Sequence, residues 1–379
     1  MKRNLLLTPG PTELPYEVRE ALARPIIHHR TGQFQEHIKK AVEGLKFVFQ
    51  TKNDIYLLTS SGTGAMEAAV ANLLSAGDKA IAVEGGKFGE RWTELCNVYK
   101  VNAQVLKIEW GHAVQAEQIE KLLKAEPDTK AVFITLCETS TGVTPNVEAI
   151  ARVVAKTQAV LVLDAISGLG VVDVQTDNWG IDVVVSGSQK GLMLPPGLAM
   201  MSVSAKALKL IEKSTSPRYY FDLRAAKKAA EKTDTPFTPA IGIIIALNES
   251  IALMKKEGLP KLFAHYARLA KGTRAAATAI GLKIFTDESG LSNVLTAISL
   301  PLNIDGEKLM ATMRDTYGVA IAGGQDQLKG KTIRIAHMGC LDEFDLLTGI
   351  SCLEKVLKQM GHKFELGAGV AAAQKVFNS

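Results

Sequence analysis

Between about residues 50 and 205, short apolar runs alternate with stretches of helical periodicity, and this alternation constrains the fold most strongly. Strands separated by helices indicate a mostly parallel α/β sheet with right-handed crossovers. We expect seven strands, at Ile55–Thr59, Lys79–Val83, Gln104–Ile108, Ala131–Leu136, Ala159–Leu163, Val183–Ser186 and Ala199–Val203. The helices between them are expected at Gly64–Leu74, Phe88–Val98, Ala116–Ala125 and Val147–Thr157. Ligands of such sheets bind beyond the carboxyl ends of the strands.

The pattern changes after Tyr220, and a smaller α+β domain is expected to follow the α/β region. A helix at Arg224–Lys232 and a long connecting helix at Ile241–Gly258 lead into it. From about residue 265 we expect a further helix, then strands at Val294–Ser299, Val319–Ile321 and Thr332–Ala336, and helices near Asp305–Tyr317 and Glu343–Met360. The last stretch, GAGVAAAQKVFNS, is expected to be a short helix or a mobile tail. The expected domain limits are 1–20, 21–262 and 263–379.

Composition excludes several other classes of protein. The net charge of +5 over 379 residues is too small and too scattered to indicate nucleic-acid binding. The longest apolar stretches, such as Ala240–Leu247, fall well short of the roughly 20 residues that a membrane span needs. The four cysteines show no C-x-x-C spacing, so neither a metal site nor a disulfide framework is indicated. We therefore expect a cytoplasmic enzyme without metal.

Lys190 and Asp164 are the strongest candidates for catalytic residues. Lys190 lies on a Ser/Gly-rich turn just after the apolar run Ile181–Val185, and Asp164 ends another apolar run. An amine at the end of a buried strand loses hydration, which lowers its pKa and makes it a nucleophile toward carbonyls. Pyridoxal phosphate (PLP) needs such a lysine for its Schiff base and a carboxylate to keep its pyridine nitrogen protonated. Taken alone, the lysine has a simpler explanation as a surface residue after a strand.

Three glycine-rich or polar turns follow other strands. Ser60–Ala69 joins a strand to a helix and is either an anion site formed by backbone N–H groups or a simple tight turn. Gly85–Trp92 offers Phe88 as a flat surface for a cofactor ring, unless that ring belongs to the core. Leu136–Asn146 offers Thr139 as a hydrogen-bonding group, although Asn146 also suits a helix N-cap.

Three further residues, on two segments, suit anionic groups. Ser188 and Gln189 precede the lysine and are candidate donors to a phosphate. Arg334 lies inside an apolar strand, where arginine is rarely buried unless paired. Its planar fork suits a substrate carboxylate, and the alternative is a structural salt bridge.

With these residues in hand, the chain resembles the class V (fold type I) PLP-dependent aminotransferases, and within them the alanine–glyoxylate, serine–glyoxylate and serine–pyruvate group. Seven segments carry the resemblance in family order: LLLTPGPTELP, SSGTGAMEAA, ETSTGV, LVLDAISGLG, SGSQKGLMLPPG, TPFTPA and IRIAHMGC. The resemblance runs nearly end to end. It implies a large PLP-binding domain with a mostly parallel seven-stranded sheet, a smaller C-terminal domain, and an N-terminal segment that packs near the active site.

The resemblance also implies a role for individual residues. Lys190 is the Schiff-base lysine and Asp164 the partner of the pyridine nitrogen. The phosphate is held by Ser61, Gly62, Thr63 and Gln189. Phe88 stacks on the ring, where many relatives have tryptophan, and Thr139 lies near the cofactor. Arg334 binds the substrate carboxylate together with the backbone around Pro9 and Gly10.

In this family a second subunit completes the active site, so the resemblance implies a homodimer. The segment that crosses matches TPFTPA, where Thr238 reaches the phosphate in the neighbouring subunit. Two positions depart from some relatives, because Thr235 stands in place of a tyrosine and Thr63 in place of a histidine.

The expected activity is amino transfer from alanine or serine to a 2-oxo acid such as glyoxylate or pyruvate, by a ping-pong mechanism. The alternatives are aspartate, another β-hydroxy amino acid or 2-aminoethylphosphonate as donor, and a non-catalytic partner subunit with the same fold. A cysteine desulfurase needs a nucleophilic cysteine on a mobile loop, whereas Cys340 directly follows the Arg334 strand.

Overall fold

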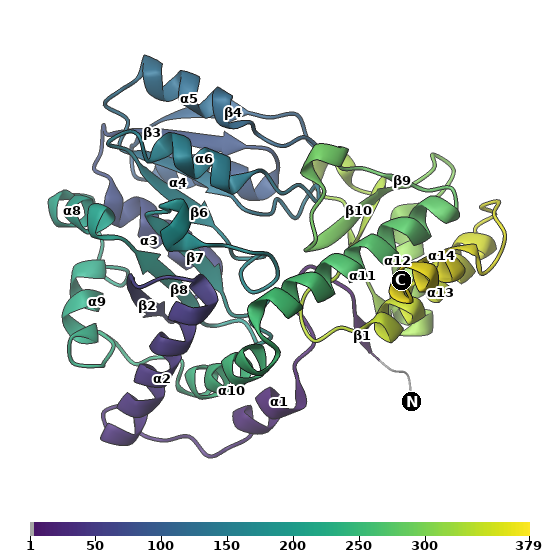
Figure 1. Ribbon diagram of the computed structural model, residues 1–379, viewed down its shortest axis with the longest axis horizontal. Helices are drawn as coiled ribbons and strands as arrows, with labels where there is room; N and C mark the ends of the chain where they lie inside the picture. The colour runs from purple at the N-terminus through teal and green to yellow at the C-terminus, as the bar shows by residue number, and fades with distance from the viewer. Residues whose placement is uncertain (1–3) are drawn as a thin grey trace.

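A seven-stranded sheet forms the centre of the larger domain in the computed structural model, which describes residues 4–379 (Figure 1). Its strand order is β2-β8-β7-β6-β5-β3-β4, and only β8 runs against its neighbours. The strands are β2 (Asp54–Leu58), β3 (Lys79–Glu84), β4 (Asn102–Lys107), β5 (Ala131–Thr135), β6 (Val160–Asp164), β7 (Val183–Gly187) and β8 (Ala199–Val203). The mostly parallel seven-stranded sheet predicted from sequence is therefore confirmed.

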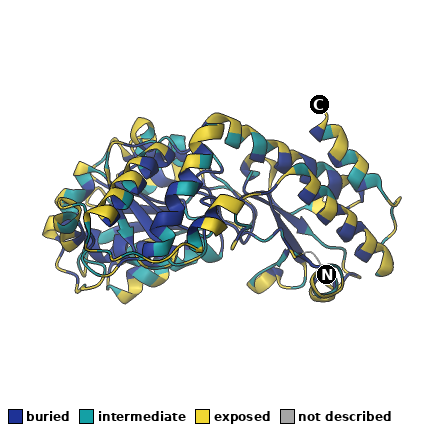
Figure 2. Cartoon of the chain, turned by 90° about the horizontal axis from the view of Figure 1, so that it is seen from below, coloured by how far each residue is buried: buried dark blue, intermediate teal, exposed yellow. Residues whose placement is uncertain are grey.

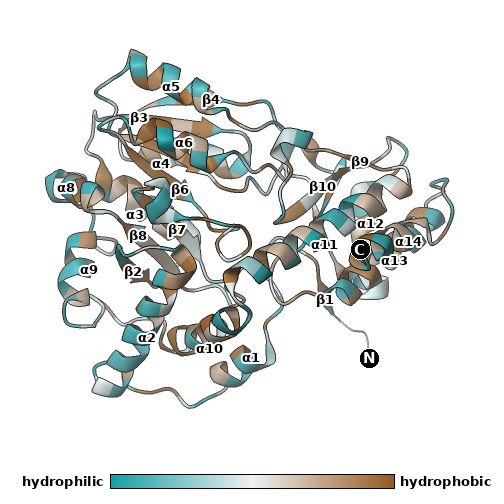
Figure 3. Cartoon of the chain, in the orientation of Figure 1, coloured by the Kyte–Doolittle hydropathy of each residue, from teal (hydrophilic) through white to brown (hydrophobic). Residues whose placement is uncertain are grey.

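Helices cover both faces of this sheet, which explains why its central strands are continuously apolar. In β6, Leu161 and Leu163 belong to one hydrophobic cluster, while Val160 and Val162 belong to another. The interior strands of the large domain are buried and largely apolar (Figures 2 and 3). The helices of this domain are α1 (Tyr16–Leu22), α2 (Gly32–Phe49), α3 (Gly62–Leu73), α4 (Lys87–Val98), α5 (Ala116–Ala125), α6 (Val147–Val154), α7 (Thr176–Trp179), α8 (Ala205–Lys213), α9 (Leu223–Ala230) and α10 (Ile241–Glu257). Asn146 caps α6 by accepting a hydrogen bond from Ala149 N at 3.0 Å, as its sequence position suggested.

The smaller domain is built on a four-stranded antiparallel sheet of order β12-β13-β10-β9. Its elements are α11 (Leu259–Ala279), β9 (Lys283–Ile284), η1 (Glu288–Gly290), β10 (Leu295–Ser299), α12 (Gly306–Tyr317), β11 (Val319–Ala320), β12 (Ala322–Gly323), η2 (Asp326–Leu328), β13 (Thr332–Ala336), α13 (Glu343–Gln359) and α14 (Ala368–Phe377). Helix α11 begins at Leu259 rather than near residue 265, and it runs from the large domain into the small one (Figure 1).

Both ends of the described chain pack on the small domain. Strand β1 (Leu5–Leu6) pairs with β11, and the next apolar residue, Leu7, is fully buried in the small-domain core. The C-terminal stretch forms helix α14 rather than a mobile tail, because Phe377 packs against α11 beside Gly272. Residues 1–3 of the expected N-terminal segment lie outside the described residues. No helix in the described range 4–379 is long and apolar enough to cross a membrane.

Replacing Leu163 by alanine tests the contribution of the central strand. Leu163 is fully buried, so Leu163→Ala is expected to lower the free energy of unfolding by about 2–5 kcal/mol, measured by urea denaturation. The matched control is Leu302→Ala, because Leu302 is fully exposed and its loss is expected to change stability by about 0.5 kcal/mol or less. Equal losses in the two variants would contradict the assignment of Leu163 to the core.

Candidate active site

Lys190 and Asp164 lie at the carboxyl ends of the adjacent parallel strands β7 and β6. Asp164 is the last residue of β6 and pairs in register with Val185, while Lys190 lies on the turn that follows β7. Parallel strands end at the same edge of a sheet, so the fold brings the amine and the carboxylate to one region. Lys190 and Asp164 therefore lie at neighbouring strand ends, as the sequence predicted.

Burial shifts the pKa of both groups toward their neutral forms. Burial lowers the pKa of Lys190 to about 8, although the negative charge of Asp164 raises it. Burial raises the pKa of Asp164 to about 7, opposed by the hydrogen bond from Ile166 N to Oδ1 at 2.8 Å. A protonated nitrogen next to Asp164 would favour the carboxylate form again. The site therefore offers an amine that loses its proton readily and an acid suited to hold a cation.

The N-terminal segment touches the lysine directly. Lys190 Nζ donates a hydrogen bond to the carbonyl oxygen of Pro9, and Thr12 Oγ1 donates to the Lys190 carbonyl at 3.1 Å. Gly10 has a φ of +104°, and a Cβ there would lie only 2.4 Å from Lys190 Cδ. Glycine is required at this position both for the backbone conformation and for the space that the lysine occupies.

The turn before α3 has the features of a phosphate site. Ser61 is the N-cap residue of this helix, yet its side chain makes no capping hydrogen bond. The buried Oε1 atom of Gln189 has no hydrogen-bond partner. A Cβ added to Gly187 would lie 3.2 Å from Gln189 Oε1 and 3.3 Å from Gly62 N, so Gln189 and the start of α3 lie on the same side of β7. The free N–H groups of an uncapped helix N-terminus suit an anion, and Gln189 can donate to it only through its side-chain NH₂ group.

Phe88 lies in the first turn of α4 and is half-buried, so it is not a core residue. The guanidinium carbon of Arg91 lies 5.1 Å from the centre of its ring. Arg91 Nη1 also donates to Thr63 Oγ1 at 3.1 Å, which links α4 to the first turn of α3. Arg91 was not among the residues predicted from the sequence, although its position three residues after Phe88 on a helix places it on the same face.

Arg334 connects the two domains at the edge of the site. Its Nε donates to the Gly323 carbonyl in the small domain, and its Nη1 donates to the Thr139 carbonyl in the large domain, both at 2.7 Å. Burial lowers its pKa to about 10. The alternative role of Arg334, a structural salt bridge, is not seen within residues 4–379. Its hydrogen bonds go to backbone carbonyl oxygens instead of to a carboxylate. They use two of the five N–H donors of the guanidinium group.

Thr139 and Thr238 occupy different surroundings. Thr139 is buried and contributes its carbonyl oxygen to Arg334. Thr238 is exposed and lines a small surface pocket with Thr59 and Tyr220, rather than contacting Lys190 of its own chain. The structure thus gathers most of the expected residues around the ends of β6 and β7, with Thr238 outside that group.

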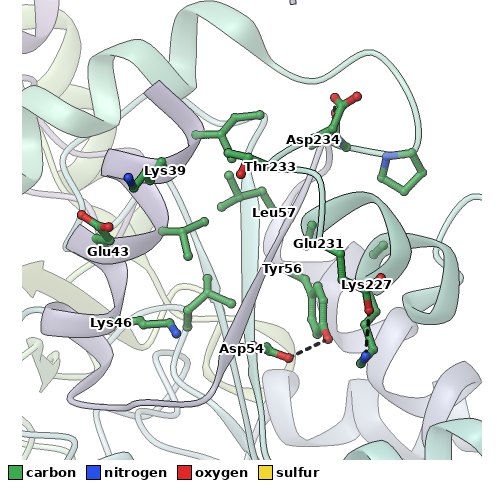
Figure 4. A pocket seen from close by; sticks show the side chains of 17 residues that line it. Lys39, Glu43, Lys46, Asp54, Tyr56, Leu57, Lys227, Glu231, Thr233 and Asp234 are labelled. Carbon is green, nitrogen blue, oxygen red and sulfur yellow. Dashed lines mark hydrogen bonds and ion pairs between the residues drawn. The ribbon is translucent and has the colours of Figure 1, made fainter. Parts of the chain in front are cut away.

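A separate cavity of about 330 Å³ lies between α2, β2, α9 and residues 233–236 (Figure 4). Tyr56 points into it and donates to Asp54 at 3.4 Å, and Lys227 pairs with Glu231 at its rim. None of the expected site residues lines this cavity. In the described part of the chain, no group of three His, Cys, Asp or Glu side chains is arranged to hold a metal ion.

Comparison with known proteins identifies the class. The family model "Aminotransferase class-V" matches residues 12–338, and the chain belongs to this family. The structure is similar to the crystal structure of ureidoglycine–glyoxylate aminotransferase from Bacillus subtilis, with a TM-score of 0.95 and 28% identity over 100% of this chain and 99% of that one. The fold is that of the PLP-dependent fold type I aminotransferases, and the chain is an aminotransferase.

Two curated relatives cover nearly the whole chain. The protein named soluble hydrogenase, small subunit, from Synechococcus sp. (strain PCC 6716) is 41% identical over 379 residues, which cover 99% of this chain and 98% of that protein. The L-aspartate–glyoxylate aminotransferase of Paracoccus denitrificans (strain Pd 1222) is 38% identical over 379 residues, which cover 98% of this chain and 96% of that protein.

The lowered pKa of Lys190 predicts how its reactivity depends on pH. Only the deprotonated amine attacks, so acylation of Lys190 by an amine-reactive reagent is expected to rise with a midpoint near pH 8, followed by peptide mass spectrometry. Asp164→Asn removes the charge that raises this pKa, so its midpoint is expected below that of the wild type. Asp128→Asn, at an exposed ion pair with Lys79, is the matched control and is expected to leave the midpoint unchanged. A wild-type midpoint near the ordinary lysine value of about 10.4 would contradict the burial argument.

Proposed function

We propose that this aminotransferase uses PLP and moves an amino group from a small amino acid, alanine or serine, to a 2-oxo acid such as glyoxylate or pyruvate. The observation that carries the proposal is the buried pair of Lys190 and Asp164 at adjacent strand ends. The acceptor is supported by the similar proteins from Bacillus subtilis and Paracoccus denitrificans, whose names both contain glyoxylate.

The residues present fit PLP as the cofactor. The uncapped start of α3 suits its phosphate, to which the side-chain NH₂ group of Gln189 would donate, and Phe88 offers a flat surface to its ring. Asp164 would hold the proton of the pyridine nitrogen, and Lys190 would be the point of covalent attachment. When bound, PLP supplies an electron sink for the carbanion that forms at the substrate Cα.

Each of the chain's own residues then has a defined task. Lys190 would accept the proton that leaves the substrate Cα, because its lowered pKa lies close to neutral pH. Pro9 holds the amine through its carbonyl oxygen. Arg334 orients the substrate carboxylate with the guanidinium donors that are not used by Gly323 and Thr139.

Aspartate is the second candidate donor, and the name of the Paracoccus denitrificans relative is the observation that favours it. Transamination occurs in two half-reactions, so the donors can be compared without knowing the acceptor. Mixing the PLP-loaded protein with alanine, serine or aspartate separately, and following loss of the visible PLP absorbance, ranks them directly. A fast change with aspartate and none with alanine or serine would overturn the donor in this proposal.

A non-catalytic partner subunit is the alternative to an enzyme, and the hydrogenase-subunit name of the Synechococcus relative raises it. A scaffold would have no use for Lys190 and Asp164, because burying a lysine and a carboxylate costs folding free energy. Both residues are retained here. We therefore favour catalysis.

The proposed enzyme is a homodimer in the cytoplasm. An aromatic group on the surface supports a second subunit: Tyr219 and Tyr220 are exposed, and both rings pack on Phe237, next to Thr238. A partner covering this group would bring Thr238 toward the other subunit. Light scattering of the purified chain distinguishes a dimer from a monomer.

Lys190→Ala tests the attachment of the cofactor. The variant is expected to lose the visible absorbance of lysine-bound PLP and the half-reaction, because no other side chain in the proposed mechanism replaces the amine. The control is Lys124→Ala, which removes an exposed lysine paired with Glu120 on α5. Unchanged absorbance in Lys190→Ala would contradict the assignment.

Arg334→Ala tests the carboxylate contact. The variant loses a charge-assisted hydrogen bond to the carboxylate, which contributes about 1.5–3 kcal/mol of binding free energy. KM is therefore expected to rise by the corresponding factor for every carboxylate substrate. Arg152→Ala is the matched control, because Arg152 is exposed and pairs with Glu148 on α6. An unchanged KM in Arg334→Ala would leave this arginine with only its bridging role between the domains.

A further inference from the structure

Glu138 is a buried carboxylate beside the residues that were predicted from the sequence. It follows β5, immediately before Thr139, and only 5% of its surface is exposed. Its Oε2 accepts hydrogen bonds from Gly89 N at 2.9 Å and Phe88 N at 3.1 Å, while its Oε1 accepts from Ser140 N at 3.2 Å and Ser140 Oγ at 2.6 Å. All four groups, three backbone N–H groups and one hydroxyl, donate to the carboxylate. An ionised carboxylate satisfies such a set of donors better than any neutral side chain does.

These contacts place Glu138 at the start of helix α4. The N-cap residue of this helix, Gly86, has no side chain to cap it, and the first N–H groups of any helix lack partners inside the helix. Glu138 supplies the missing acceptor from a different part of the chain. Its negative charge also lies at the positive end of the helix dipole.

The first turns of α4 carry the groups that face the proposed cofactor. Phe88 is itself one of the two α4 residues whose N–H groups donate hydrogen bonds to Glu138. Arg91, one turn later, lies over the Phe88 ring and donates to Thr63 at the proposed phosphate turn. A shift in the first turn of α4 would therefore move both the Phe88 ring and the hydrogen bond from Arg91 to Thr63.

The fit around the carboxylate is tight. A Cβ at Gly86 would lie 2.3 Å from Ser140 Oγ and 2.6 Å from Glu138 Cδ, so even one methyl group there would displace the contact. Burial raises the pKa of Glu138, although the hydrogen bonds from Ser140, Gly89 and Phe88 each lower it. Its charge also raises the pKa of Arg334, so it favours the charged form of the proposed carboxylate-binding residue.

We propose that Glu138 is a positioning residue that fixes the first turn of α4 and thereby holds Phe88 against the cofactor ring. This inference rests on the proposed function, because it needs PLP to lie on Phe88. It assigns Glu138 no contact with the substrate.

A double-mutant cycle on the full-length chain tests the inference through binding rather than activity. The dissociation constant for PLP is measured by absorbance titration for wild type, Glu138→Gln, Phe88→Ala and the double variant. Glu138→Gln places an NH₂ group against backbone donors and is expected to weaken PLP binding about tenfold to a hundredfold. Since Glu138 acts through Phe88, the double variant is expected to bind about as weakly as Phe88→Ala alone.

Two further variants separate positioning from loss of folding. Gly86→Ala keeps the carboxylate but crowds it, so it is expected to weaken PLP binding in the same way as Glu138→Gln. Glu148→Gln changes a half-buried glutamate that pairs with Arg152 on α6, and it is expected to leave the binding unchanged. Thermal unfolding of the cofactor-free variants must show a folded chain in each titration.

The outcomes are distinguishable. If Phe88→Ala alone leaves PLP binding unchanged, the stacking role in the proposed function is wrong and this inference falls with it. If Phe88→Ala weakens binding but Glu138→Gln does not, or if the two effects multiply in the double variant, the proposed function stands and the positioning role of Glu138 is wrong.

Discussion

The burial of Lys190 beside Asp164 is the interaction on which the rest of the site depends. Removing an amine and a carboxylate from water disfavours the charged form of each, which is why the pKa of Lys190 falls to about 8 and that of Asp164 rises to about 7. The large sheet creates this environment because helices cover both of its faces. At the carboxyl edge of the sheet, β6 ends at an acid, Asp164, and the turn after the neighbouring β7 carries an amine, Lys190.

The small domain and the N-terminal segment close the same region from the other side. Arg334 holds the carbonyls of Gly323 and Thr139 together across the two domains, and the backbone at Pro9 and Gly10 packs directly on Lys190. These contacts join parts of the chain that are far apart in sequence. A change in the arrangement of the domains would therefore alter the carboxylate contact and the surroundings of the lysine together.

The sequence predicted the parts of the fold and site that depend on local pattern. The buried strands are continuous apolar runs, and Lys190 and Asp164 follow two of them, so their common location could be inferred from parallel strand order. Glu138 could not be inferred in this way, because its partners Phe88 and Gly89 lie on another segment, and the same holds for the bond from Arg91 to Thr63. The ordering of the C-terminal stretch depends on the packing of Phe377 against α11, which no local pattern reveals. The role of Thr238 depends on a second subunit and stays a prediction.

The central claim is that Lys190 is the residue to which PLP is attached. Borohydride reduction of the PLP-loaded protein fixes the cofactor on its lysine, and mass spectrometry of the digested chain identifies the modified peptide. We predict one phosphopyridoxyl group, on the peptide that contains Lys190. A modified peptide from elsewhere in the chain, or none at all, would contradict the account.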